Sequence, residues 1–255
     1  MINIYPDEIT SISADEEDAD WPVENLQDEH PKNYYKGTDR DATIVAVASK
    51  GGACGVIATN AVSATLTLSS GQTLELADDL ELADDLELDT TGDSDVTSVE
   101  LLPGDISGAV LFEFTTRSSS FTATLYLVAN AGEIIQAGIL RIGDRNDFED
   151  PETPIQQGLK DYSLVDELNN GATDIVKRDV VWTFDGELWV PRDTQFVLFM
   201  RTVARAVGPL PLVWRVSEGL TNSMFIVFAR FTEMPSGRHE TGTDSLIRFH
   251  LLEVI

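Results

Sequence analysis

Short apolar runs recur along the chain from residue 42 onward, rich in Val, Ile, Thr and Phe and separated by Gly, Asp, Asn and Ser. In one run apolar and polar residues alternate strictly, which places two sets of side chains on opposite faces of a strand. One face carries Phe121, Ala123, Leu125 and Leu127, and the other carries Thr122, Thr124 and Tyr126. Regularly spaced short strands with turn residues between them predict an antiparallel β-sandwich or barrel.

A period of three to four residues replaces this alternation once, in the final quarter of the chain. The apolar positions of that stretch are Phe196, Phe199, Met200, Val203 and Val207. Asp193 or Thr194 can cap its start, and Gly208 followed by Pro209 stops it. The spacing predicts one amphipathic helix over residues 193–207.

Between the two halves the strand pattern is lost, and Asp, Pro, Asn and Gly accumulate. We expect a long acidic loop there, because structureless segments of this length inside a compact domain are uncommon and are more often functional or partner-bound. The predicted organisation is an N-terminal arm leading into the sandwich (1–41), the β-sandwich (42–142), the acidic loop (143–175) and a β-rich second half with helix 193–207 (176–255).

A six-residue unit, ELADDL, is written twice within Glu75–Leu88. Its leucines fit strand parity and also helical spacing, so periodicity alone leaves both open. The repeat and the following DTTGDSD supply carboxylates for a calcium site, with Asp89, Asp93 and Asp95 as candidate ligands. The fixed spacing and the terminal Glu of an EF-hand loop are missing. We therefore expect a solvated acidic extension of a sandwich hairpin and no cofactor, with calcium binding as the alternative.

The charge balance is strongly acidic. There are 17 Lys and Arg against 44 Asp and Glu, which gives a formal net charge of −27 and a pI of about 4.1. Such a surface repels nucleic-acid phosphates and anionic membranes, so we expect neither as a partner. The acidic residues are dispersed and form no dense stripe, which disfavours DNA mimicry and fits a protein from salty, marine or halophilic surroundings.

Cys54 is the single cysteine, and its apolar flanks predict a small buried core residue. One cysteine allows neither an intrachain disulfide nor a cysteine-based zinc site within one chain. The N-terminal stretch lacks a basic region followed by an apolar core, and no apolar run approaches the roughly 18 residues of a membrane span. We expect no signal peptide and no transmembrane segment.

Common catalytic motifs are missing from the sequence, including GxSxG, Walker A, GxGxxG and HExxH. The stretch LELDTTGDS is similar to an aspartic-protease turn, but an extra Thr intervenes and no second copy exists. His30, His239 and His250 lie far apart in the sequence. A glycosidase needs only two suitably placed carboxylates, so a carbohydrate-active enzyme remains an alternative to the non-enzymatic protein that we expect.

The stretch from Asp20 to Asp39, DWPVENLQDEHPKNYYKGTD, carries a pattern of turn, aromatic and basic residues. The pattern positions are Pro22, Asn25, Leu26, Asp28, Pro31, Tyr35, Lys36 and Gly37. They resemble the opening of a set of tailed-bacteriophage virion proteins. The later segments GVIATNAVSATLTL, EIIQAGILRIG and LIRFHLLEVI are similar to strands of the same family, whereas the ELADDL repeat departs from it.

The resemblance implies a mainly-β, galactose-binding-like (discoidin-type, jelly-roll) antiparallel sandwich, here with a C-terminal α+β extension carrying one amphipathic helix. It also implies a structural virion protein of the tail or baseplate, assembled in the host cytoplasm with other virion proteins and copies of itself. The alternative is a host-receptor or glycan-binding module. In that case Trp21, Tyr34 and Tyr35 would stack on a sugar while Asp39 and Arg40 bind its hydroxyls. Without a ligand, Trp21 and Tyr35 would simply cover the end of the sandwich.

Overall fold

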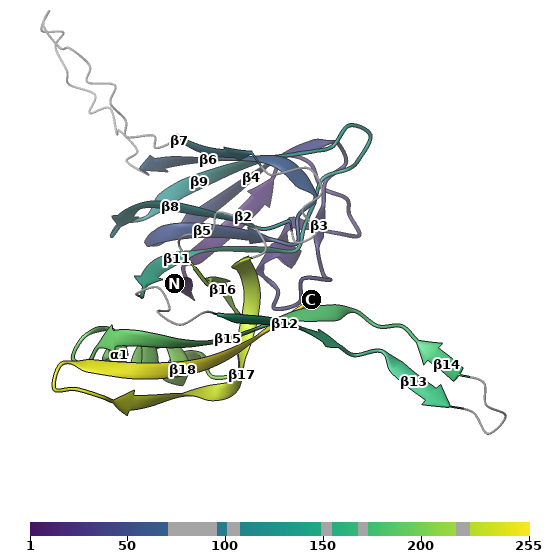
Figure 1. The fold of residues 1–255 in the computed structure, drawn as a ribbon. Helices are drawn as coiled ribbons and strands as arrows, with labels where there is room; N and C mark the ends of the chain where they lie inside the picture. The colour runs from purple at the N-terminus through teal and green to yellow at the C-terminus, as the bar shows by residue number, and fades with distance from the viewer. Residues whose placement is uncertain (71–95, 101–107, 149–154, 168–172, 218–224) are drawn as a thin grey trace, which may run out of the picture.

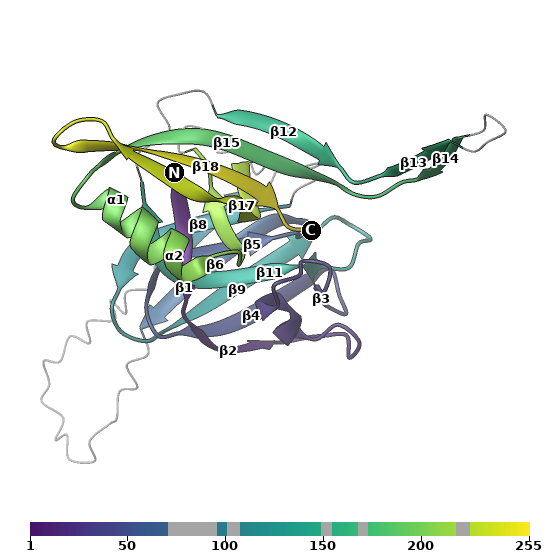
Figure 2. The same ribbon diagram turned by 90° about the horizontal axis from the view of Figure 1, so that it is seen from below.

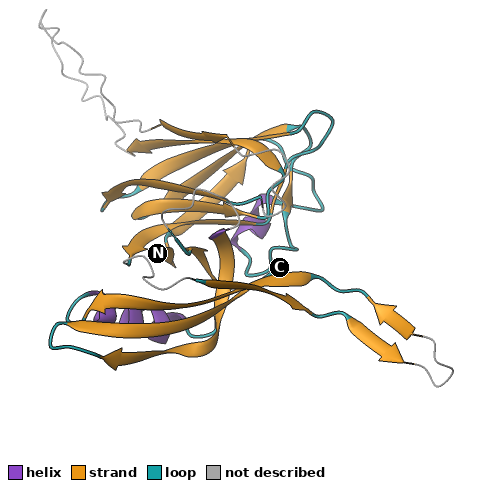
Figure 3. Cartoon of the chain, in the orientation of Figure 1, coloured by secondary structure: helices purple, strands orange, loops and turns teal. Residues whose placement is uncertain are grey.

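The computed structural model of the 255-residue chain describes residues 1–70, 96–100, 108–148, 155–167, 173–217 and 225–255. Strands dominate this part of the chain, and one helical stretch lies in its C-terminal half (Figure 3). No helix among the described residues is both long enough and apolar enough to cross a bilayer. The mainly-β fold class that the sequence predicts is confirmed.

The first layer is a five-stranded antiparallel sheet (Figure 1). In spatial order it contains β2 (Ile9–Ala14), β4 (Asp41–Ala48), β9 (Phe121–Ala129), β6 (Ala61–Ser70) and β7 (Val96–Glu100). In β9 the residues predicted to face the core, from Phe121 to Leu127 at alternate positions, are buried, while Tyr126 is exposed. The alternation therefore identified the correct faces.

The second layer is a nine-stranded sheet that extends through both halves of the chain. Its first half consists of β8 (Val110–Arg117), β5 (Gly51–Ile57), β11 (Ile139–Asp147) and β1 (Ile2–Asp7). Its second half continues with β16 (Leu212–Arg215), β17 (Ile226–His239), β18 (Asp244–Glu253), β15 (Val180–Pro191) and β12 (Gln156–Asp161). One core cluster fills the space between β5, β8 and β11 of this sheet and β4, β6 and β9 of the first layer.

Strand β5 is buried along its whole length, because the second half of the large sheet covers its outer face. Gly55 shows how close this approach is, since a Cβ added there would lie 2.8 Å from Cγ1 of Val213 in β16. Cys54 in the same strand is fully buried, and burial raises the pKa of its thiol. The prediction that Cys54 is a core residue is confirmed.

The predicted amphipathic helix is one continuous helical stretch with a wide central turn, lying across the second half of the large sheet (Figure 2). It consists of α1 (Gln195–Val197), the π-helical segment η2 (Leu198–Ala204) and α2 (Arg205–Val207). Phe199, Val203 and Val207 are buried in a second core cluster, as their spacing predicts. Gly208, with a φ of 59°, ends the helix. The helix begins at Gln195, two residues after the predicted start, and Thr194 occupies the N-cap position without a side-chain capping bond.

Two predicted boundaries are corrected by the strand pairing. Residues 1–41 are not a separate arm, because β1 lies between β11 and β16 and β2 forms an edge of the five-stranded sheet. Residues 143–175 are not a loop, because β11 extends to Asp147 and further strands follow it. No apolar alternation marks β12 in the sequence, because both of its faces are largely exposed.

Beyond β12 and β15 the chain continues as a two-stranded sheet that projects from the body in both views (Figures 1 and 2). It consists of β13 (Leu164–Glu167) and β14 (Thr173–Val176), with Leu164 opposite Val176. The remaining elements are the short helix η1 (Val23–Gln27) and the two-stranded pair of β3 (Tyr35–Lys36) with β10 (Gln136–Ala137).

Candidate functional site

The segment from Asp20 to Asp39 lies over one end of the sandwich, and its two half-buried aromatic side chains pack on each other. The rings of Trp21 and Tyr34 are stacked, with centroids 4.3 Å apart and planes 6° from parallel. The amide of Lys36 donates to the carbonyl oxygen of Trp21 at 3.2 Å. One ring face of each aromatic residue is therefore occupied by the other.

Tyr35 is a structural residue. Its side chain is fully buried in the sandwich core, and its hydroxyl donates to the carbonyl oxygen of Glu16 at 2.5 Å. Burial, together with the carboxylates of Asp15, Glu17 and Glu16, raises the pKa of this hydroxyl. The prediction that Tyr35 contacts a sugar is wrong, because the ring faces core residues instead of solvent.

Asp39 and Arg40 are exposed, but both are used by the turn that holds them. The carboxylate of Asp39 accepts the Arg40 amide at 2.8 Å, and its carbonyl oxygen accepts the Ile135 amide at 3.0 Å. Nε of Arg40 donates to the carbonyl oxygen of Ala129 at 2.8 Å. These contacts fix the turn to the end of β9.

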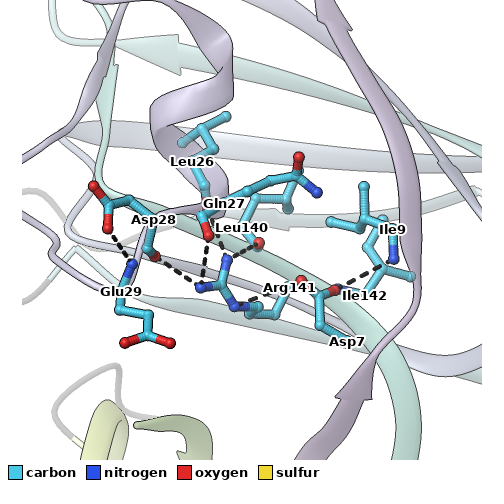
Figure 4. A network of polar contacts seen from close by, with 9 residues as sticks. All are labelled: Asp7, Ile9, Leu26, Gln27, Asp28, Glu29, Leu140, Arg141 and Ile142. Carbon is cyan, nitrogen blue, oxygen red and sulfur yellow. Dashed lines mark hydrogen bonds and ion pairs between the residues drawn. The ribbon is translucent and has the colours of Figure 1, made fainter. Parts of the chain in front are cut away.

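A polar network that was not predicted from the sequence anchors the same segment to the sandwich (Figure 4). Arg141 of β11 donates through Nη1 to Leu26 O at 3.0 Å and through Nη2 to Gln27 O at 3.2 Å and Asp28 O at 2.7 Å. These are carbonyl groups at the C-terminal end of η1, where backbone acceptors lack partners within the helix. The one available signal was a basic residue inside the otherwise apolar run ILRIG.

Asp7 completes the network from the other side. Its carboxylate lies 3.6 Å from Nε of Arg141 and accepts the amide of Ile142 at 3.2 Å. The pKa of Asp7 is raised, because the effect of burial exceeds the opposite effects of Arg141 and of the backbone amides. Burial also disfavours the charged form of Arg141 and lowers its pKa. Since the guanidinium is occupied by backbone carbonyls, the cluster holds the chain together and is not arranged to bind a ligand.

A small surface cavity of about 190 Å³ lies on the β17–β18 hairpin. Its lining residues are Ser236, Gly237, Arg238, Leu246 and Arg248. Both arginines are paired, Arg238 with Glu240 and Arg248 with Glu187. The volume is below the roughly 300–1,000 Å³ of typical small-molecule sites, so the cavity is a poor candidate for a binding pocket.

The described residues contain no group of three or more His, Cys, Asp or Glu side chains placed to hold a metal ion. Asp89, Asp93 and Asp95, the candidate calcium ligands, lie outside the described residues together with the ELADDL repeat. His250 pairs with Asp185 at 2.6 Å, and His239 contacts Ser245 Oγ at 2.7 Å. The two histidines thus have separate structural partners.

The most prominent exposed apolar surface follows β12 to β15 and the projecting β13–β14 sheet. We call residues 159–167 and 173–180 the projecting ribbon. Its exposed large apolar side chains are Leu159, Tyr162, Leu164, Ile175, Val176 and Val180. Leu159 and Ile175 retain 61% and 62% of their surface in solvent. A concentration of exposed apolar residues in one segment of this kind favours an interaction site.

Hydrogen bonds stiffen the point where the projecting ribbon leaves the body. The amide of Ser163 donates to Asp161 Oδ1 at 2.7 Å, and Ser163 Oγ accepts the Arg178 amide at 3.0 Å. Lys32 Nζ donates to Asp179 Oδ2 at 2.5 Å, which ties the ribbon to the segment preceding Tyr34. These contacts fix the base of the ribbon relative to the body.

No protein-family model matches this chain, and no curated protein matches it. Two solved structures are similar in shape. One comes from a crystal structure of reduced XRCC1 bound to the DNA polymerase β catalytic domain, with a TM-score of 0.38, 9% identity and coverage of 56% of this chain and 98% of that one. The other is chitosan-binding module 1 of a chitosanase/glucanase from Paenibacillus sp. IK-5, with a TM-score of 0.35, 11% identity and coverage of 54% and 98%. At these scores neither similarity bears on function.

Proposed function

We propose that this chain is a non-enzymatic structural component of a tailed-phage virion, in the tail or baseplate, that acts through protein–protein contacts. The projecting ribbon is the observation that carries the proposal. It exposes six large apolar side chains outside the core. Three of them, Leu164, Ile175 and Val176, lie on β13 and β14, which pair only with each other among the described strands. A surface of this kind favours a protein partner over a small ligand.

The segment that resembles phage virion proteins fits a structural role. Trp21 packs on Tyr34, Tyr35 is buried, and Arg141 holds the end of η1. These contacts explain the turn, aromatic and basic residues of the pattern as devices that close one end of the sandwich. An assembly protein needs such a rigid end, because a fixed geometry lowers the ordering cost of association.

The proposal is tested by immunogold electron microscopy of purified particles from the source of the chain, with antibody raised against it. We expect label at the tail end, and a band of this chain in denatured particles. Antibody absorbed beforehand with the purified chain is the control and should leave no label. Unlabelled particles that also lack the chain after denaturation would contradict a virion role.

Glycan binding is a second candidate function, favoured by the half-buried Trp21–Tyr34 pair at the end of the sandwich. The outer face of such a pair can stack on a sugar ring. A glycan array probed with the wild-type chain and with Trp21→Ala tests it. Tyr126→Ala, which removes an exposed tyrosine of the five-stranded sheet, is the matched control. Binding lost in the first variant and kept in the second would favour a receptor-binding role.

A further inference from the structure

The projecting ribbon is incompletely stabilised by its own strands. Its outer part, β13 with β14, is a two-stranded sheet, and isolated two-stranded sheets are only marginally stable in water. The apolar side chains of Leu164 and Val176 lie opposite each other and are both exposed. The ribbon therefore gains stability from any partner that covers this pair.

Charge is segregated along the ribbon on either side of the Leu164–Val176 pair. The inner part carries three exposed basic residues, Lys160, Lys177 and Arg178, and two acidic residues, Asp161 and Asp179, for a net charge of 3 − 2 = +1. The outer strands carry Asp166, Glu167 and Asp174 and no basic residue, for a net charge of −3. Of the inner carboxylates, Asp179 is already paired with Lys32.

We propose that two copies of this chain associate through antiparallel pairing of their projecting ribbons. This inference rests on the proposed assembly function and names a partner for it. The two-fold axis passes near Leu164 and Val176, so that the cationic inner part of each ribbon meets the acidic outer part of the other. A symmetric interface of this type uses the same patch on both copies and needs a self-complementary surface.

A second copy fits the ribbon better than an unrelated protein because the ribbon carries both complementary halves itself. Lys160 and Asp166 are six positions apart along the chain, and the midpoint between them is Ser163, next to Leu164. An antiparallel copy centred there brings opposite charges together at both ends and apolar side chains together in the middle. A parallel copy would place like charges side by side, which is unfavourable.

Sedimentation velocity of the full chain and two charge-reversal variants tests the pairing, over concentrations of about 1 to 100 μM. The inner variant is Lys160→Glu, Lys177→Glu and Arg178→Glu, and the outer variant is Asp166→Lys, Glu167→Lys and Asp174→Lys. We expect a wild-type dimer and a dissociation constant at least about tenfold higher for each variant alone, because three contacts at each end become repulsive. An equimolar mixture of the two variants should dimerise again, because the reversed inner part of one matches the reversed outer part of the other.

The matched control reverses three exposed arginines near the helix, Arg192→Glu, Arg201→Glu and Arg205→Glu, and changes the net charge by the same amount as the inner variant. It should dimerise as the wild type does. A monomeric wild type, variants that dimerise normally, or a mixture that stays monomeric would each overturn the pairing. If the wild type is monomeric but particles carry the chain, the pairing fails while the proposed function stands. If the wild type dimerises but particles lack the chain, the pairing stands while the proposed function fails.

Discussion

The carboxylate of Asp7, at the end of β1, lies 3.6 Å from Nε of Arg141 in β11, while the rest of the guanidinium reaches the end of η1. One side chain thus connects the first strand of the chain, a central strand of the large sheet and the segment that closes the sandwich. The same guanidinium lies 5.6 Å from the ring centroid of Phe228 in β17. Arg141 therefore contacts both halves of the molecule.

Arg141→Ala should lower the free energy of unfolding by about 2–4 kcal/mol. The variant leaves the partly exposed Asp7 carboxylate without its cation and removes the donors to the end of η1. Denaturant unfolding followed by circular dichroism measures the loss. Arg145→Ala is the control, since Arg145 lies in the same strand in more exposed pairs with Glu113 and Asp147, and should cost less than about 1 kcal/mol. Equal losses in the two variants would contradict the special role of Arg141.

Tyr35→Phe should cost about 1 kcal/mol, because it removes one hydrogen bond to Glu16 without changing the packing of the ring. Tyr126→Phe is the comparison, since its exposed hydroxyl donates to Asp41 at 2.8 Å on the outer face of the first sheet. That change should stay within about 0.5 kcal/mol. The midpoints of urea unfolding at a constant m-value report both effects. A larger loss at Tyr126 would mean that the buried hydroxyl contributes little.

The stability of the chain relative to Glu253→Gln should fall as pH rises above about 4.5. Burial raises the pKa of Glu253 from its ordinary value of 4.5, although the Trp182 amide, which donates to this carboxylate at 2.9 Å, opposes the shift. A carboxyl that binds its proton more tightly in the folded state favours that state at low pH, and the advantage is lost as pH rises through the folded pKa.

The glutamine side chain keeps an acceptor for Trp182 and carries no charge to bury. Thermal melting of both proteins between about pH 4 and 7 measures the difference. A wild type that gains stability relative to the variant over this range would show that the charged form of Glu253 is favoured in the fold.

Dimerisation should respond to salt in two stages. Each copy has a net charge of −27, and the Debye length shortens from about 30 Å at 0.01 M to about 8 Å at 0.15 M. Long-range repulsion between the bodies is screened first, so the dissociation constant should fall over this range. It should rise again towards about 1 M, where the close contacts between the ribbons are screened as well. Sedimentation in a salt series checks this, and a dimer that is tightest at the lowest salt would contradict it.

The strands that the sequence predicted best have one buried and one exposed face. In β9 the neighbours Leu125 and Tyr126 are buried and exposed, respectively. Such a difference between the two faces of a strand produces the alternation of apolar and polar residues in the sequence. The helix could be predicted for the same reason, because it has one buried and one exposed face, with Val203 in the core and Arg201 in solvent. Where a strand is buried on both sides, as β5 is around Cys54, only a continuous run of small and apolar residues remained.

The candidate site was predicted less well, because it depends on contacts between distant parts of the chain. No local pattern relates Arg141 to Leu26, or Asp7 to Ile142. The aromatic residues near position 35 looked equivalent in the sequence, yet Tyr34 is half-buried against Trp21 and Tyr35 is wholly buried. A shift of one residue in a short strand reverses the side of the backbone on which a side chain lies, and here it separates a surface residue from a core residue.

The position of β1 has a consequence for the order of folding. Ile2 pairs on one side with Asp147 and on the other with Arg215, so β1 is a middle strand of the large sheet and both of its neighbours come much later in the chain. Its place in that sheet is completed only after β16 has been synthesised. Contacts of such long sequence separation slow folding. Until these contacts form, Ile2 and Ile4, which are buried in the folded protein, stay exposed to solvent. During that time β1 is open to incorrect pairing with other strands.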